Sequence, residues 1–258
     1  LAHDGPDVPD EEVEQPLALH AAATRDSARI VERGGKRVAY VHLWSGVGDG
    51  PAANAIVDLV MSRPEGSVAI AVLGPMTNLA LALRQEPRLA ERLGPVVVMG
   101  GARSEGGNIT ASAEFNIWAD PDAAAEVFAS GCQMTVFGLD ATHQVRATED
   151  RIAAVEAVGT PSSDTAAAML RFSQRIERTI VGWDAAPLHD PCTVAYLLKP
   201  ELFSTMPCRI EVETASELTR GHTAVEFRVD PATARHRWAV AADGQGVFDL
   251  LTETLKAK

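Results

Sequence analysis

Short runs rich in β-branched residues alternate with segments of helical periodicity, and this alternation restricts the fold more than any other feature. The β-rich runs cover residues 37–43, 67–73, 95–99 and 133–138, and helical periods cover residues 52–63, 77–85 and the segment from Asp120 to Gly131. Strands that alternate with helices of this length are typical of βαβ units, in which helices cover a parallel sheet. We therefore expect an α/β fold with a mostly parallel sheet flanked by helices.

The second half of the chain does not continue this regular alternation of short strands and helices. We expect a long helix over residues 163–181, a helix after His189-Asp190-Pro191, a closing helix over residues 247–255, and strands at residues 209–214, 223–229 and 237–241. A length of 258 residues suits a single domain, residues 1–258. Residues 1–16 contain six acidic residues and three prolines, and we expect them to form a surface segment or a frayed end.

Composition argues against two classes of partner. The chain has 23 Lys and Arg against 35 Asp and Glu, a net charge of −12, so it offers no broad basic face to nucleic-acid phosphates. No run approaches the roughly 18 apolar residues of a membrane span, and the acidic first dozen residues do not resemble a signal peptide.

The three cysteines are odd in number and unpatterned, which favours a reducing, cytoplasmic location.

In parallel α/β sheets, ligands bind beyond the carboxyl ends of the strands. The loops after Leu73, Met99 and Gly138 are therefore the first candidates for a functional site. In the first loop, residues 74–78, Thr77 either caps the following helix or belongs to a tight turn that directs a carbonyl or hydroxyl oxygen toward an ion.

The loop after Met99 is rich in glycine, which allows the backbone to approach a ligand closely. If residues 113–117 are extended, Glu114 and Asn116 lie on one face. A carboxylate beside the amides of Asn108 and Asn116 can hold the hydroxyls of a sugar, because Glu accepts and Asn both donates and accepts. The alternative is a polar loop with a solvated Glu114.

Two further acidic features have simple structural explanations. Asp190 before Pro191 can be a helix cap, as Asp120 before Pro121 is expected to be, and His189 can be a surface histidine. The N-terminal acids are Asp4, Asp7, Asp10, Glu11, Glu12 and Glu14. Such a cluster either binds a hard cation such as Ca²⁺ or forms a solvated tail.

Taken in order, the motifs of this chain resemble those of the inosine–uridine-preferring nucleoside hydrolase family. They are Gly74-Pro75-Met76-Thr77-Asn78, Val98-Met99-Gly100-Gly101, Gly107-Asn108, Ala113-Glu114-Phe115-Asn116, Asp120-Pro121, Gly138-Leu139-Asp140 and His189-Asp190-Pro191-Cys192. The resemblance extends from about residue 40 to the C-terminus. It implies an α/β domain that binds Ca²⁺ and hydrolyses the N-ribosidic bond of nucleosides to free base and ribose. We expect a homo-oligomer that acts on a small nucleoside.

The resemblance also implies roles for individual residues. Four side chains would form the ribose pocket: Met99, Asn108, Glu114 and Asn116. The carbonyl of Thr77 and the carboxylate of Asp190 would bind calcium, His189 would protonate the leaving base, and His42 would lie near the base. This set fits the chemistry, since an oxocarbenium-like state is stabilised by groups that hold the sugar hydroxyls, a metal-bound water is a nucleophile, and a histidine can donate a proton.

One motif of the family is missing or degenerate. An N-terminal Asp-x-Asp-x-x-x-Asp-Asp motif supplies calcium ligands and the general base in the family, and its nearest counterpart here is Asp4, Pro6, Asp10 and Glu11, which matches two positions. We therefore expect residues 1–36 to be a divergent or truncated N-terminal region. Besides hydrolysis, the sequence is compatible with a member that binds nucleoside or ribose without cleaving it, or with a poorly folded fragment.

Overall fold

The computed structural model describes residues 29–33, 36–40 and 50–256. These residues form two compact units, one that extends to Ile70 and includes Thr77–Gly94, and one formed by Ala71–Met76 and the chain from Pro95 onward. We describe each unit by itself. The expectation of a single domain stays a prediction.

The described residues of the first unit form a hairpin and three helices. Strands β1 (Arg29–Arg33) and β2 (Lys36–Tyr40) pair antiparallel, and helix α2 (Gly50–Met61) packs against α3 (Thr77–Gln85) and α4 (Leu89–Arg92). Helix α2 buries Ala52, Ala53, Ile56 and Val60, the apolar face that its helical periodicity predicts. The predicted strand 37–43 is confirmed as far as Tyr40, and its remaining residues lie outside the described ones.

A six-stranded sheet, in the order β3-β4-β5-β10-β8-β9, is the main feature of the second unit. The strands are β3 (Ile70–Val72), β4 (Val96–Met99), β5 (Met134–Phe137), β10 (His236–Ala242), β8 (Phe203–Val212) and β9 (Thr223–Glu226). Neighbours β4 and β5, and β5 and β10, are parallel, whereas β10–β8 and β8–β9 are antiparallel. The α/β class is confirmed, whereas the sequence did not predict that β8 runs antiparallel to its two neighbours β10 and β9.

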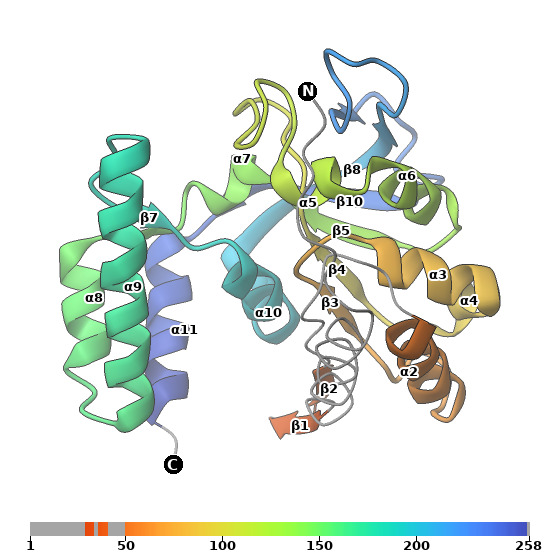
Figure 1. Cartoon of the computed structure of the whole chain (residues 1–258). Coiled ribbons are helices and arrows are strands. Elements are labelled where there is room, and N and C mark those ends of the chain that lie inside the picture. The colour runs from red at the N-terminus through yellow and green to blue at the C-terminus, as the bar shows by residue number, and fades with distance from the viewer. Residues whose placement is uncertain (1–28, 34–35, 41–49, 257–258) are drawn as a thin grey trace, which may run out of the picture. The chain divides into compact units, whose positions relative to one another are not determined.

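The helices of the second unit connect these strands. They are α5 (Phe115–Ala119), α6 (Pro121–Ala129), α7 (Leu139–Thr142), α8 (Glu149–Glu156), α9 (Pro161–Ile180), α10 (Asp190–Leu198) and α11 (Gly244–Lys256), with the short 3₁₀ turn η1 (Pro200–Leu202). A small ladder joins β6 (Arg146–Ala147) to β7 (Ala186–Pro187). Helices α8, α9 and α11 pack together as a group of three (Figure 1). No helix in the described part of the chain is long and apolar enough to cross a membrane.

Some predicted boundaries are wrong in instructive ways. The strand expected at 67–73 is only Ile70–Val72, because the Ser67 N–H and hydroxyl both donate to the Pro64 carbonyl in a turn. Residues 113–117 are not extended: α5 begins at Phe115, and Glu114 is its N-cap. In contrast, Asp120 caps α6 as expected, with its carboxylate accepting the Ala123 N–H at 3.0 Å.

Aromatic side chains anchor the core of the second unit beneath the strand ends. The Phe137 ring packs edge-on against Phe203 with centroids 4.9 Å apart and lies 5.3 Å from Tyr196. Trp238 is fully buried, and its ring occupies the space that a side chain at Gly138 would need. Packing therefore requires a glycine at position 138, because the backbone of the loop after β5 lies directly against the Trp238 ring.

Candidate active site

The loops after β4 and β5 are joined by hydrogen bonds at the carboxyl ends of the strands. The Leu139 N–H donates to the Gly101 carbonyl at 2.9 Å. The Asp140 carboxylate accepts the N–H groups of Arg103 at 2.8 Å and Ser104 at 2.7 Å. These bonds fix the glycine-rich segment after Met99. Sequence reasoning did not assign Asp140 this role, although it lies in the Gly138-Leu139-Asp140 motif.

Glu114 is the centre of this network. It is 2% exposed, and its carboxylate accepts the N–H groups of Gly101 at 2.9 Å, Asn116 at 3.0 Å and Ile117 at 3.3 Å. Burial raises the pKa of Glu114, which the three N–H donors oppose and the charge of Asp190 reinforces. Glu114 is therefore neither solvated nor a simple hydroxyl acceptor, since most of its acceptor capacity already holds the backbone in place.

The predicted ribose-pocket residues are brought together around Glu114. The side-chain amide of Asn116 donates to the Met99 carbonyl at 3.1 Å and contacts its sulfur at 3.4 Å. Asn108 Oδ1 accepts the Phe115 N–H at 2.9 Å. Met99, Asn108, Glu114 and Asn116 thus form one connected cluster, whereas His42 lies outside the described residues.

His189 and Asp190 lie at the start of α10. His189 is the N-cap residue and Asp190 is the first helical residue, so the expectation of Asp190 as the cap is wrong. Burial raises the pKa of Asp190. The His189 Nδ1 atom lies 2.8 Å from the hydroxyl of Thr142, which is fully buried. Burial, with smaller effects of His143 and Arg146, lowers the pKa of His189 to about 4.

An aromatic and charged group adjoins His189. The His143 ring lies 5.8 Å from the His189 ring and packs edge-on against Trp183 at 4.9 Å. The Arg146 guanidinium lies 3.9 Å from the centre of Trp183, and His143 Nδ1 lies 2.9 Å from the carboxylate of Glu105. Sequence reasoning missed this group, because its members are far apart in the chain and form no local motif.

The described residues do not complete a calcium site. None of them form a group of three or more His, Cys, Asp or Glu residues that could hold a metal ion. Asp190 contributes one carboxylate, and the oxygens of Glu114 are occupied by N–H donors. Thr77 begins α3 in the first unit, and Asp4, Asp7 and Asp10 lie outside the described residues. Because Ca²⁺ needs six to eight oxygen ligands, this part of the chain alone does not fit the ion.

A profile of the inosine-uridine preferring nucleoside hydrolase family matches residues 15–249. The chain belongs to this family. The resemblance found in the sequence motifs is thereby confirmed, and so is the fold class.

The chain is similar to several proteins that are named ribonucleoside hydrolases. The chain is 40% identical to the pyrimidine-specific ribonucleoside hydrolase RihA of Shewanella baltica over 211 residues, which are 80% of this chain and 66% of that protein. It is 38% identical to RihA of Escherichia coli over 230 residues, 84% of this chain and 73% of that protein. The solved structure of a purine-preferring ribonucleoside hydrolase from Gardnerella vaginalis superposes with a TM-score of 0.73 at 30% identity, covering 84% of this chain and 69% of that one. The chain spans about two thirds of the length of the first of these relatives.

Proposed function

We propose that the protein hydrolyses the N-ribosidic bond of nucleosides, releasing the base and ribose. The observation that supports this best is the connected cluster of Met99, Asn108, Glu114 and Asn116, with His189 at the start of α10 in the same unit. Membership of the nucleoside hydrolase family supports the same reaction.

Asn108 and Asn116 hold the ribose hydroxyls in this proposal. Each keeps polar atoms beyond those that bond to the backbone, since Asn108 uses its Oδ1 toward Phe115 and Asn116 uses its Nδ2 toward Met99. Glu114 holds Asn116 in register, because it caps the helix in which Asn116 lies, and Asn108 is tied to the same helix by the Phe115 N–H. A rigid set of donors and acceptors stabilises the positively charged sugar of the transition state better than a flexible one.

His189 delivers a proton to the leaving base. The free protein holds the ring neutral at pH 7, because burial lowers its pKa to about 4. A leaving base that gains negative charge raises the pKa of an adjacent imidazole, so the ring takes up a proton from solvent as the bond breaks and passes it to the base. The hydroxyl of Thr142 occupies Nδ1 and leaves Nε2 as the atom that exchanges the proton.

Calcium binding is part of the proposal, with Asp190 and the Thr77 carbonyl as ligands. The described residues leave such a site incomplete, so we assign no step of the reaction to the ion. Its presence is tested by elemental analysis of the purified chain, and the substitution Asp190→Asn should lower any calcium content that is found.

The decisive experiment is a ribose-release assay on inosine and uridine, since the relatives include pyrimidine-specific and purine-preferring enzymes. Turnover of either nucleoside supports hydrolysis. A second candidate is a member that binds nucleoside or ribose without cleaving it, which is favoured because the described residues contain no group of three or more side chains that could hold a metal ion. Ribose binding without turnover, measured by calorimetry, would select that candidate.

A further inference from the structure

The short helix α7 contacts both halves of the candidate site. Its Asp140 carboxylate accepts two N–H groups from the first part of the Asn108 loop, residues 101–113. Asn108 is one of the two asparagines proposed to hold the ribose. Further along the same helix, the Thr142 hydroxyl lies 2.8 Å from Nδ1 of the proposed acid, His189. This single turn of helix therefore contacts both the sugar-binding loop and the acid.

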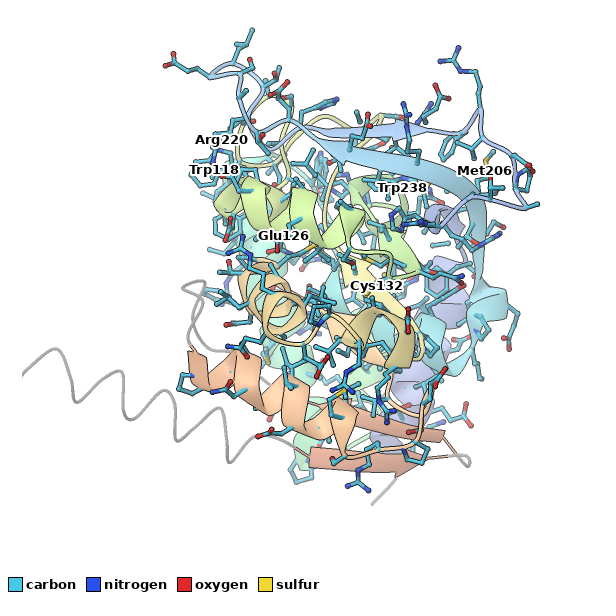
Figure 2. All side chains as sticks on the ribbon, turned by 90° about the vertical axis from the view of Figure 1, so that its right-hand side faces the viewer. Trp118, Glu126, Cys132, Met206, Arg220 and Trp238 are labelled. Carbon is cyan, nitrogen blue, oxygen red and sulfur yellow. The ribbon has the colours of Figure 1, made fainter. Side chains whose placement is uncertain are left out.

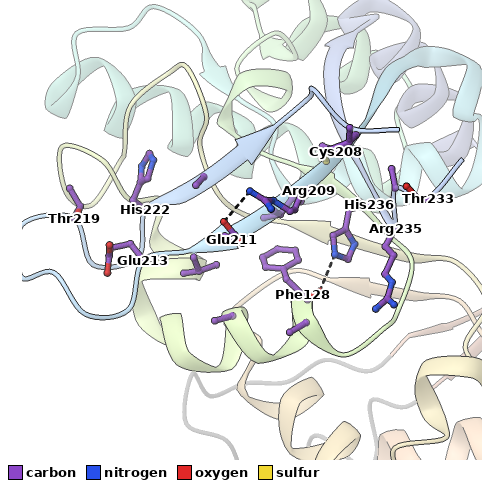
Figure 3. Close-up of a pocket in the computed structure, with 17 residues that line it drawn as sticks. Phe128, Cys208, Arg209, Glu211, Glu213, Thr219, His222, Thr233, Arg235 and His236 are labelled. Atoms are coloured by element: carbon purple, nitrogen blue, oxygen red, sulfur yellow. Dashed lines mark hydrogen bonds and ion pairs between the residues drawn. The ribbon is translucent and has the colours of Figure 1, made fainter. Parts of the chain in front are cut away.

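The Asn108 loop is held at both of its ends. A side chain at Gly101 would meet the buried Trp238 ring at 3.1 Å, so the loop begins directly against the core of the sheet (Figure 2). At the other end, His222 Nδ1 lies 3.2 Å from the Ser112 carbonyl, and His222 pairs with Ala113 in an isolated β-bridge. His222 also lines a cavity of about 880 Å³ between α6 and strands β8 and β9 (Figure 3). Both ends of the loop are thus fixed by the sheet and the chain beside it.

The middle of the loop is held through a side chain. Residues 101–112 form neither helix nor strand, and Gly106 has a φ of +77°. Glycine loses more conformational freedom on folding than any other residue, so a fixed contact beside it limits the conformations that the loop can adopt. Glu105 makes this contact directly before Gly106, since its carboxylate lies 2.9 Å from Nδ1 of His143. His143 follows α7, so the contact leads back to the same helix.

His143 is itself held in a fixed position. Its side chain is 13% exposed, packs edge-on against Trp183 at 4.9 Å and lies 5.8 Å from the His189 ring. Its carbonyl accepts the Nε–H of Arg146 at 2.8 Å, and the Arg146 guanidinium lies over Trp183. A carboxylate only accepts, so Nδ1 of His143 carries the hydrogen. The Glu105 carboxylate, which is 42% exposed, thus reaches from the surface to a ring that its neighbours hold in place.

We propose that Glu105 and His143 are positioning residues for ribose binding, because their contact holds the Asn108 loop so that Asn108 faces the sugar. Neither residue touches the substrate in this arrangement. Glu105 acts through Asn108, whereas His143 also packs beside His189 and so acts on both halves of the site. Groups that are locked in place before the substrate binds need no reorganisation during the reaction. The inference rests on the proposed function, because it gives both residues a part in that reaction.

Glu105→Ala removes the contact at an exposed position, where the fold does not depend on the side chain. We expect ribose affinity to fall about fivefold in titration calorimetry, the effect of one net hydrogen bond. The KM values of inosine and of a nitrophenyl riboside should rise by the same factor with little change in kcat, because both substrates carry the same sugar. Glu105→Gln keeps an acceptor oxygen and should recover most of the affinity.

Glu253→Ala is the matched control. The Glu253 carboxylate is exposed on α11 and lies 3.7 Å from Lys199, so this substitution also breaks an ion pair of the second unit, but outside the candidate site. It should leave ribose affinity and both KM values unchanged. Equal losses in the Glu253 and Glu105 variants would show that the effect is not specific to the Asn108 loop, and would overturn the proposal.

His143→Ala tests the other member of the pair. If Glu105 acts through His143, the variant that carries both alanines should bind ribose no more weakly than His143→Ala alone. His143→Ala should also lower kcat for inosine more than for the nitrophenyl riboside, because its ring lies beside the acid and only inosine needs the proton. The Glu105 variants decide the proposal by themselves if the His143 variant does not fold.

Calorimetry separates a failure of this inference from a failure of the proposed function. If the unaltered chain binds ribose, unchanged affinity in Glu105→Ala or additive losses in the double variant would overturn the positioning role alone. This comparison holds whether or not the chain cleaves inosine. An unaltered chain that neither binds ribose nor cleaves inosine would refute the proposed function, and this inference with it.

Discussion

The hydroxyl of Thr142 and the Nδ1 atom of His189 lie 2.8 Å apart, although 46 residues separate them in the chain. Thr142 is the last residue of the short helix α7, which follows β5, and His189 is the N-cap residue of α10. Thr142 is fully buried, so its hydroxyl has no alternative partner in solvent. The contact fixes the orientation of the imidazole that the proposed reaction uses.

Thr142→Val keeps the shape of this side chain but removes the hydroxyl. We expect turnover of inosine to fall about tenfold, the equivalent of one hydrogen bond to the ring, with little change in KM. Thr142→Ser restores the oxygen and should recover most of the activity, as measured in the ribose-release assay. Equal activity of the Val and wild-type chains would show that the ring needs no support from Thr142.

His189→Ala separates proton donation from the other steps. Inosine needs a proton on its leaving base, whereas a nitrophenyl riboside has a leaving group that departs without one. We expect the substitution to slow inosine cleavage by about 10²–10⁴-fold and to affect the nitrophenyl riboside far less. The two substrates are compared under the same conditions, and similar losses on both would refute the role of His189 as the acid.

Asn116→Ala tests the ribose pocket without reference to turnover. Loss of the amide removes polar contacts to the sugar hydroxyls, and we expect ribose affinity to weaken by about 1–3 kcal/mol in calorimetry. Asn54 is exposed on α2 in the first unit, and Asn54→Ala is the control that should leave affinity unchanged. An unaltered affinity in the Asn116 variant would remove that residue from the pocket.

The glutamate in the same segment shows what sequence reasoning could and could not establish. The motif Ala113-Glu114-Phe115-Asn116 predicted a ribose pocket at this segment because its residues match those of a known family, and that assignment stays a prediction. The extended conformation predicted for residues 113–117 was wrong, because a helix of five residues is too short to show a helical periodicity in the sequence. The buried state of Glu114 depends on Gly101, thirteen residues away, and a local pattern carries no signal of such a tertiary contact.

The same physical limit applies elsewhere in the chain. The cap at Asp120-Pro121 was predictable because capping is a local interaction between neighbours. The reversed direction of β8 was not predictable, since the direction of a strand follows from how the connections cross the sheet rather than from strand composition. The group formed by Glu105, His143 and Trp183 likewise exists only in the folded chain.

Glu114→Gln should destabilise the protein as well as affect binding. An amide has one acceptor oxygen, so at least one of the three N–H groups now held by the carboxylate would face an NH₂ group. We expect the free energy of unfolding to fall by about 1–3 kcal/mol in urea denaturation. Glu149 is exposed and pairs with Arg171, so Glu149→Gln should cost less than about 1 kcal/mol. A Glu114 variant no less stable than this control would contradict the central role of its carboxylate.

The pKa of His189 predicts how stability changes with pH. Burial lowers this pKa from 6.5 to about 4, so between these values the unfolded chain binds a proton that the folded chain does not. The contribution of neutral His189 is complete above pH 6.5 and is lost as the pH falls toward 4, by up to about 3 kcal/mol. The raised pKa values of Glu114 and Asp190 act in the opposite direction, because the folded chain then binds protons more readily. His189→Gln leaves these carboxyl groups in place, so the difference between the two proteins isolates the histidine. Urea denaturation at pH 7 and pH 5 should show a smaller loss of stability in the variant, and identical losses would mean that the His189 ring is already protonated in the folded chain at pH 5.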